Sequence, residues 1–203
     1  YLNAAWCFLV DTTDPWGLRS YAAFIGVLTV LAAGWFFRQL FSPGWSLFGM
    51  ALVAGSRWLF SINRTAMATI DETILLTFLV LTAYIKTFRS ERTGYYILTG
   101  LLLGLAMHLH TGARILPVII GVDIIIQSVR NPGRLKRKFG LNAALLILSA
   151  VIVFLPMARY ILDHSDDYMK RSGETLLATE YPGWHPVGPL LQNVQNYLRM
   201  YFY

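Results

Sequence analysis

The sequence of 203 residues is 56% apolar and only 14% charged, and its mean hydropathy is +0.50. Soluble domains carry about 25% charged residues. This composition therefore excludes a disordered chain and a soluble nucleic-acid-binding protein, and indicates an integral membrane protein. The net charge of +6 does not by itself indicate a polyanionic partner, because its distribution along the chain has another explanation.

Six apolar segments predict membrane-spanning helices. A spanning helix needs about 20 mostly apolar residues, because the hydrocarbon core of a bilayer is about 30 Å thick. The candidate spans, of which the fourth is the shortest, are residues 20–41, 45–62, 70–88, 95–109, 113–129 and 141–162. We therefore predict an all-α fold, a polytopic membrane helical bundle of about six transmembrane helices with additional interfacial helices.

Polar segments flank the predicted bundle at both ends of the sequence. Residues 1–19 are predicted to form an extracytoplasmic or interfacial segment, and residues 20–162 the six-span bundle. Residues 163–203 are predicted to form an extracytoplasmic loop and a helix that lies in the interface, because residues 190–203 have helical apolar spacing but are too few to span. The sequence begins with Tyr1 and shows neither an initiator Met nor the pattern of a signal peptide. We therefore expect the sequence to be a fragment of a longer protein.

Basic residues gather in alternate connections between the predicted spans. Nine of the 17 Lys and Arg residues lie in three short connections: Arg38, Lys86, Arg89, Arg92, Arg130, Arg134, Lys136, Arg137 and Lys138. Lys and Arg are retained on the cytoplasmic side of membranes, so these connections are predicted to be cytoplasmic and both chain ends extracytoplasmic. Residues 130–138 are thereby explained as a topogenic loop that contacts anionic lipid, and no nucleic-acid partner is predicted.

Two adjacent carboxylates, Asp71 and Glu72, stand where the third span starts. The dipole of a helix stabilises carboxylates at its N-terminus by about 0.3–1 kcal/mol each. One interpretation is therefore an acidic helix cap, with Thr69 or Asp71 as the capping residue. The other is a functional site, because polar groups at the lipid boundary are costly.

The connection between the fourth and fifth spans carries His108, His110 and Arg114. Two His residues at positions i and i+2 of a helix do not face one another, so these two alone do not predict a zinc site. Interfacial hydrogen bonding is the simpler interpretation of both. Arg114 suits bidentate recognition of a phosphate, or it anchors the helix at the interface.

Three features of the sequence predict packing rather than chemistry. Asp123 lies deep in the fifth span and is expected to pair with an Arg or a hydroxyl of a neighbouring helix. Gly100 and Gly104 have the spacing that lets two helix backbones approach closely. Cys7, the only cysteine, is expected to be a small buried apolar residue. The sequence contains no nucleotide-binding loop, dinucleotide fingerprint or zinc motif.

Several short segments, in order, resemble a known family. They are PWGLRSYAA at residues 15–23, Arg64 followed by ATIDETIL at residues 68–75, and GLLLGLA at residues 100–106 followed by ARILP at residues 113–117. Together they resemble the multi-spanning GT-C glycosyltransferases, especially the bacterial family 39 or protein-mannosyltransferase-like group. Ile70 stands where that family commonly has Pro.

The resemblance implies a glycosyltransferase that moves a sugar from a polyprenyl-phosphate donor to a hydroxyl acceptor at the extracytoplasmic membrane face. It implies an integral protein of a bacterial plasma (inner) membrane, with the bilayer and a polyprenyl-phosphate-linked sugar as partners. The cofactor stays unassigned, with a divalent metal as one candidate. The family's catalytic base would lie upstream of Tyr1.

The resemblance also suggests roles for individual residues at the extracytoplasmic face. Asp71 and Glu72 would be catalytic, whereas the residues expected to bind substrate are Arg64, Arg114, His108 and His110. Arg64, Asp71 and Arg114 are expected to reach one shared pocket.

Two other classes stay open. A transporter or flippase of a lipid-linked substrate would show inverted repeats and helices interrupted near the bilayer midplane. A non-catalytic membrane scaffold would need no acidic cluster at all.

Overall fold

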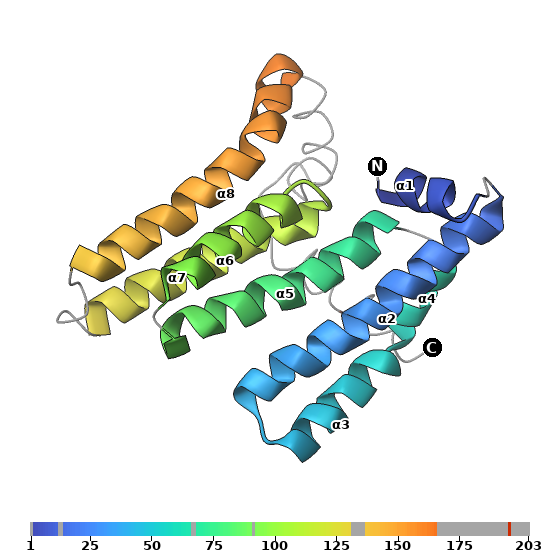
Figure 1. Ribbon diagram of the computed structural model, residues 1–203, viewed down its shortest axis with the longest axis horizontal. Helices are drawn as coiled ribbons and strands as arrows, with labels where there is room; N and C mark the ends of the chain where they lie inside the picture. Colours follow the sequence, from blue (N-terminus) through green and yellow to red (C-terminus); the bar gives the residue numbers. More distant parts are fainter. Residues whose placement is uncertain are drawn as a thin grey trace. The chain divides into compact units, whose positions relative to one another are not determined.

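The computed structural model describes residues 2–11, 14–65, 68–90, 92–130, 137–165 and 195. These residues form helices and contain no strand. In chain order the helices are α1 (Leu2–Leu9), α2 (Pro15–Leu40), α3 (Pro43–Ala54), α4 (Arg57–Thr65), α5 (Ala68–Ser90), α6 (Thr93–Ala106), the 3-10 turn η1 (Thr111–Arg114), α7 (Ile115–Arg130) and α8 (Arg137–Asp163) (Figure 1). The chain divides into two compact units, residues 1–155 and 156–203.

The first unit exposes large apolar side chains and buries small and polar ones. Thr29, Thr87 and Thr99 are completely buried, whereas Phe60 and Ile125 are 62% and 63% exposed. Water-soluble proteins bury such large apolar side chains, but in lipid an apolar surface costs nothing and close packing of small residues holds helices together. This burial pattern is that of a bundle surrounded by hydrocarbon.

Among the residues that the structure describes, three helices are long and apolar enough to cross a membrane: Pro15–Leu40, Gly112–Arg130 and Phe139–Asp163. A fourth crossing results if α3 and α4, which are bent by 45° at the break between them, count as one span. The all-α membrane bundle is thereby confirmed.

The predicted third and fourth spans are both helical. However, α5 is not among the helices apolar enough to be counted as a crossing, and α6, with 14 residues, is short for one. The total of six crossings therefore stays a prediction.

The second predicted span, 45–62, is interrupted. Helix α3 ends at Ala54, and α4 begins at Arg57. Gly55 and Ser56 lie between them, and such Gly and Ser pairs are common places for a sharp kink. The sequence interpretation treated this segment as one continuous helix.

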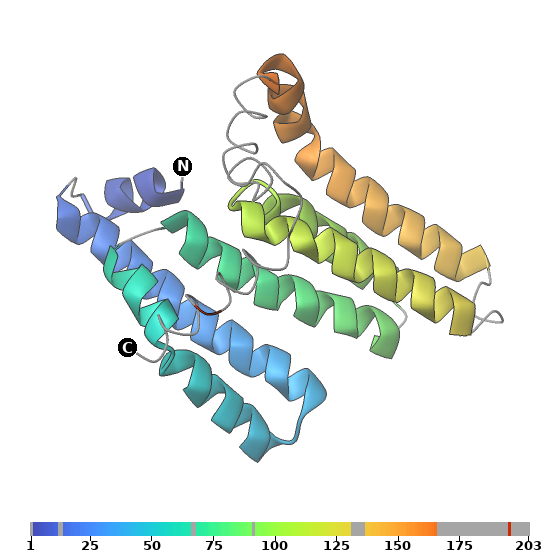
Figure 2. The same cartoon turned by 180° about the vertical axis from the view of Figure 1, so that it is seen from behind.

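Helix α5 lies between α2 and α6, as both face-on views show (Figures 1 and 2). Helix α6 in turn packs closely against α8. A Cβ atom added to Gly100 would lie 2.0 Å from Ser149 Oγ, and one added to Gly104 would lie 2.6 Å from the carbonyl oxygen of Ala150. The close backbone approach predicted from these glycines is confirmed.

The main apolar core joins α5, α6, η1, α7 and the first part of α8. Its buried members are Val80, Tyr84, Tyr96, Leu103, Ala106, Ala113, Leu116, Ile120 and Leu146. Beside this core, the Tyr84 hydroxyl donates a hydrogen bond to Asp123 Oδ2 at 2.8 Å. The expectation that Asp123 pairs with a hydroxyl of a neighbouring helix is confirmed. Cys7, in contrast, is only partly buried on α1.

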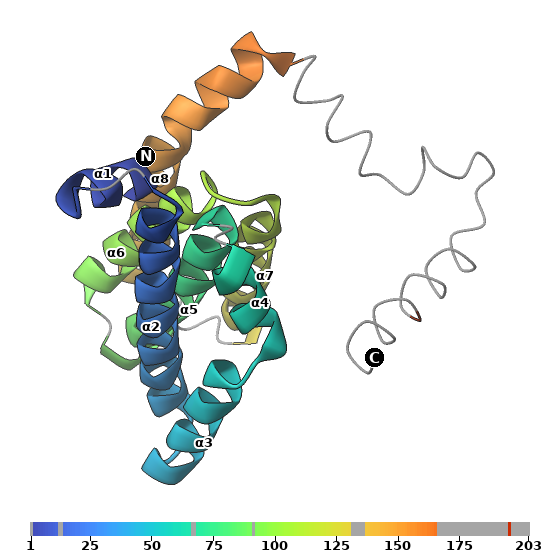
Figure 3. The same ribbon diagram turned by 90° about the vertical axis from the view of Figure 1, so that its right-hand side faces the viewer.

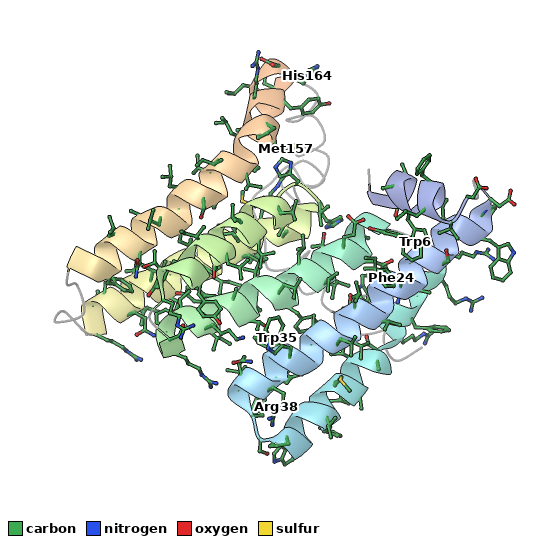
Figure 4. The ribbon with its side chains drawn as sticks, viewed as in Figure 1. Trp6, Phe24, Trp35, Arg38, Met157 and His164 are labelled. Atoms are coloured by element: carbon green, nitrogen blue, oxygen red, sulfur yellow. The ribbon has the colours of Figure 1, made fainter. Side chains whose placement is uncertain are left out.

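The second unit is described for the last turns of α8, which carry Pro156 within the helix. Arg159 and Asp163 approach to 3.8 Å, and the rings of Tyr160 and His164 stack with centroids 4.5 Å apart (Figure 4). Apart from residue 195, the loop and interfacial helix predicted beyond residue 165 lie outside the described residues.

Candidate functional site

The two adjacent carboxylates lie in the first turns of α5. The helix begins at Ala68, earlier than the sequence predicted, so Thr69 and Asp71 both lie inside it. The interpretation of either residue as the helix cap is therefore wrong. Asp71 is completely buried, and Glu72 is 8% exposed.

Each carboxylate has its own partner on a different helix. Consecutive helical residues point about 100° apart, so Asp71 and Glu72 face different neighbours. The hydroxyl of Tyr21 on α2 donates a hydrogen bond to Glu72 Oε1. The amide nitrogen of Asn63 on α4, in the orientation that satisfies both groups, donates to Asp71 Oδ1 at 2.7 Å and to Oδ2 at 3.2 Å.

A glycine makes room for the contact between Asn63 and Asp71. A Cβ atom at Gly26 of α2 would lie 2.3 Å from the Asn63 side-chain amide. The space left by the missing side chain of Gly26 is therefore filled by Asn63. Helices α2, α4 and α5 thus meet around the two acids.

Helix α1 packs against the start of α2 (Figure 3). Its Trp6 contacts three residues of α2. Trp6 donates through Nε1 to Ser20 Oγ at 2.9 Å. Its ring stacks on Phe24, with centroids 4.9 Å apart, and meets Tyr21 edge-on at 6.0 Å (Figure 4). The ring of Tyr21 is therefore held by Trp6 while its hydroxyl is held by Glu72.

The predicted cations lie on elements that contact α5. Arg64 follows Asn63 on α4, but its side chain is exposed and its guanidinium lies over the Phe60 ring at 5.9 Å. The contact to Asp71 thus comes from Asn63, the residue before Arg64. Arg114 is partly buried at the end of η1, which packs against α5. A pocket shared by Arg64, Asp71 and Arg114 stays a prediction.

The two histidines make local hydrogen bonds. His110 is exposed, and its Nδ1 accepts from the backbone N–H of Gly112 at 3.1 Å, which caps η1. His108 Nε2 lies 2.7 Å from the carbonyl oxygen of Val153 in α8. A carbonyl only accepts, so Nε2 of His108 carries a proton. Both contacts agree with the hydrogen-bonding interpretation of these residues.

The described residues do not assemble a metal centre. Within these ranges no three His, Cys, Asp or Glu side chains gather closely enough to hold an ion. Asp71 and Glu72 would supply two oxygen ligands, and further ligands would have to come from substrate or from outside the described residues.

Positive charge collects at the opposite ends of α2 and α5. Lys86 Nζ lies 4.4 Å from the centroid of the ring of Trp35, the residue labelled on α2 in Figure 4, and 5.6 Å from the centroid of the Tyr95 ring. The guanidinium of Arg89 donates to the carbonyl oxygen of Gln39. Lys86 and Arg89 therefore lie at the end of α5 remote from Asp71 and Glu72.

The fold and this separation define a class of protein, an all-α integral membrane protein with buried acids at one end of its bundle. The family model described as dolichyl-phosphate-mannose-protein mannosyltransferase matches residues 2–158. The chain belongs to this family, and the resemblance to GT-C membrane glycosyltransferases is confirmed. No curated protein and no solved structure matches the chain.

Sequence reasoning missed Tyr21, Asn63 and Gly26. Each had a weak signal, since Tyr21 and Asn63 carry hydrogen-bonding groups at the outer ends of predicted spans, and Gly26 is a gap in an apolar helix. Only the packing of three helices shows that these residues belong with Asp71 and Glu72.

Proposed function

We propose that this chain acts in transferring a sugar from a polyprenyl-phosphate donor to a hydroxyl acceptor at the extracytoplasmic face of a bacterial plasma membrane. The observation that carries the proposal is the pair of buried carboxylates, Asp71 and Glu72, at the start of α5. They lie at the opposite end of this helix from Lys86 and Arg89. The family description names a dolichyl-phosphate-linked mannose as donor and protein as acceptor. A donor of this kind reaches its enzyme from the bilayer.

The reaction needs few groups. The acceptor hydroxyl loses its proton to a base as its oxygen bonds to the sugar, and the bond between the sugar and the phosphate oxygen breaks. The electron pair leaves with the phosphate, so cations near that oxygen stabilise the transition state. A carboxylate and one or two guanidinium groups meet these needs.

We assign these roles to the residues that the resemblance indicates. Asp71 and Glu72 form a second acidic part of the site, which positions the substrate or a divalent metal, and the base that takes the acceptor proton is expected upstream of Tyr1. Arg64, exposed on α4, and Arg114, at the end of η1, would bind the phosphate of the carrier. The histidines His108 and His110 would add hydrogen bonds to the sugar or the phosphate.

Transfer of radiolabelled mannose from dolichyl-phosphate mannose tests these roles in the complete protein. Asp71→Asn and Arg114→Ala should each lower kcat/KM by roughly a hundredfold, as expected for loss of a group that positions the substrate or binds the phosphate. Lys86→Gln, at the basic end, is the matched control and should keep its rate. Wild-type rates for both site variants would remove these residues from the site.

The membrane face can be tested separately. In a Cys7→Ala background, Arg64→Cys and Arg89→Cys each place one thiol at an exposed position at opposite ends of the bundle. A membrane-impermeant maleimide should label the thiol at position 64 in intact cells and the thiol at position 89 only after permeabilisation. The opposite pattern would place the acidic site in the cytoplasm and contradict the proposal.

A transporter of lipid-linked substrates keeps one structural argument, the interruption between α3 and α4. The same assay separates the two functions. A transporter would leave the bond between sugar and phosphate intact, whereas the proposed transferase releases the polyprenyl phosphate.

A further inference from the structure

The carboxylate of Glu72 is held by a neutral hydrogen-bond donor. An Arg partner would bind both carboxylate oxygens in a bidentate pair and would compensate the negative charge. The hydroxyl of Tyr21 instead donates one hydrogen bond, to Oε1. This contact fixes the orientation of the carboxylate while it leaves the charge in place.

Tyr21 is itself held firmly, so its hydroxyl has a defined position. The residue is only 4% exposed and packs with Ile25 in a small apolar cluster that includes Trp6 and Leu75. A buried ring loses little further freedom when its hydroxyl forms a hydrogen bond. Tyr21 can therefore set the direction of a flexible Glu side chain rather than follow it.

We propose that Tyr21 is a positioning residue for Glu72, an inference that rests on the proposed function. By holding Oε1, Tyr21 leaves Oε2 as the oxygen that faces the reacting group. The role of Tyr21 is thus exerted through Glu72 and not through contact with substrate. Removal of its hydroxyl should lower the rate of the chemical step more than the affinity for the donor.

The same bundle contains a matched control. The hydroxyl of Tyr84 on α5 donates to Asp123 Oδ2, so this pair has the same chemistry as that of Tyr21 and Glu72. Tyr84 is 7% exposed, close to the 4% of Tyr21. Thirteen residues separate Tyr84 from Asp71 along α5, or about 20 Å of helix. Loss of the Tyr84 hydroxyl therefore measures the structural cost of losing such a pair.

The experiment compares Tyr21→Phe, Tyr84→Phe, Glu72→Gln and the double variant Tyr21→Phe with Glu72→Gln in the complete protein. Mannose transfer from dolichyl-phosphate mannose and thermal unfolding in detergent are measured for each. We expect Tyr21→Phe to lower kcat about tenfold, the effect of one hydrogen bond to a charged group. Its KM should stay within about twofold of the wild-type value. Tyr21→Phe and Tyr84→Phe should lower the unfolding temperature by similar amounts, but Tyr84→Phe should keep the wild-type kcat.

The double variant tests whether Tyr21 acts through Glu72. Its kcat should be no lower than that of Glu72→Gln alone, because Tyr21 then has no carboxylate to position. Independent, multiplying losses would overturn the inference. An equal loss of kcat in Tyr21→Phe and Tyr84→Phe would also overturn it, since both contacts would then be merely structural.

The proposed function and this inference fail in different ways. Wild-type kcat in Glu72→Gln would remove Glu72 from the site and contradict the site assignment itself. A large loss in Glu72→Gln together with wild-type kcat in Tyr21→Phe would leave the site standing and exclude the positioning role.

Discussion

The two ends of α5 hold charged groups in opposite ways. At its start, Asp71 and Glu72 are buried and take hydrogen bonds from Asn63 and Tyr21, two side chains of fixed geometry. At its end, Lys86 lies against aromatic rings, and the exposed Arg89 reaches a backbone carbonyl. Helix α2 contributes to both ends, so the difference comes from the partners and from their burial.

The difference teaches where the bundle tolerates change. A cation over an aromatic face has broad geometric freedom, and an exposed one can be hydrated. A buried carboxylate that loses its donor has no water to replace it, and the full cost of desolvation remains. Small substitutions at the acidic end of α5 should therefore lower the stability of the protein strongly, and those at the basic end only weakly.

The largest expected effect is that of Asn63→Asp. This change places a second carboxylate against Asp71 and removes the amide donor, which should destabilise the protein by about 3–5 kcal/mol, the cost of an uncompensated buried charge. The loss of stability should become smaller as the pH falls, because the carboxyl groups at positions 63 and 71 no longer repel each other once one of them is protonated. Unfolding in detergent at pH 8 and pH 5 measures both effects.

The basic end offers the same substitution as a control. Asn142 is also buried, and its Oδ1 accepts from the Thr93 hydroxyl at 3.0 Å. An Asp at position 142 can still accept this hydrogen bond, whereas an Asp at position 63 would lie against Asp71. Asn142→Asp should therefore cost less than Asn63→Asp, and equal costs would contradict the comparison of the two ends.

A smaller effect is expected from Gly26→Ala. The added methyl group would displace the Asn63 amide from Asp71, at a cost of about 1–3 kcal/mol as for other overpacked sites. Gly140, near the start of α8, has nothing within 4 Å of an added Cβ atom. Gly140→Ala should therefore stabilise the protein, by up to about 1 kcal/mol through helix propensity. Unfolding in detergent should therefore show a lower free energy of unfolding for Gly26→Ala and a higher one for Gly140→Ala.

The smallest effect is expected from Lys86→Met. The substitution keeps an unbranched side chain of similar length and removes the cation from the Trp35 ring, which should cost about 0.5–1 kcal/mol. Mannose transfer should stay at the wild-type rate. In a background that carries both Trp35→Leu and Tyr95→Leu, Lys86→Met should no longer change the stability. Persistence of the difference there would exclude the cation–π contacts as its cause.

Much of the fold could be predicted from local pattern. Apolar length predicted the helical segments, and the spacing of Gly100 and Gly104 predicted a close helix contact because small residues act through the backbone alone. The break at Gly55 was missed because average hydropathy over residues 45–62 does not register one interrupted turn. Its signal was the Gly and Ser pair itself.

The candidate site could be predicted only in part. Asp71 and Glu72 stood out because charge is costly near lipid. Tyr21 and Asn63 could not be recognised, because their contacts depend on how three helices are rotated about their axes. One residue along α4 decides whether Asn63 or Arg64 faces Asp71, and a single sequence does not reveal that rotation.

The break between α3 and α4 has a consequence for the stability of the bundle in hydrocarbon. Where a helix stops inside a bilayer, its terminal amides and carbonyls have no water to bind. Ser56 limits that deficit: its carbonyl oxygen accepts from the Phe60 N–H at 3.0 Å, and its hydroxyl lies 3.5 Å from the Leu59 nitrogen. The chain thus changes direction by 45° at this break while Ser56 supplies two acceptors to N–H groups in the first turn of α4.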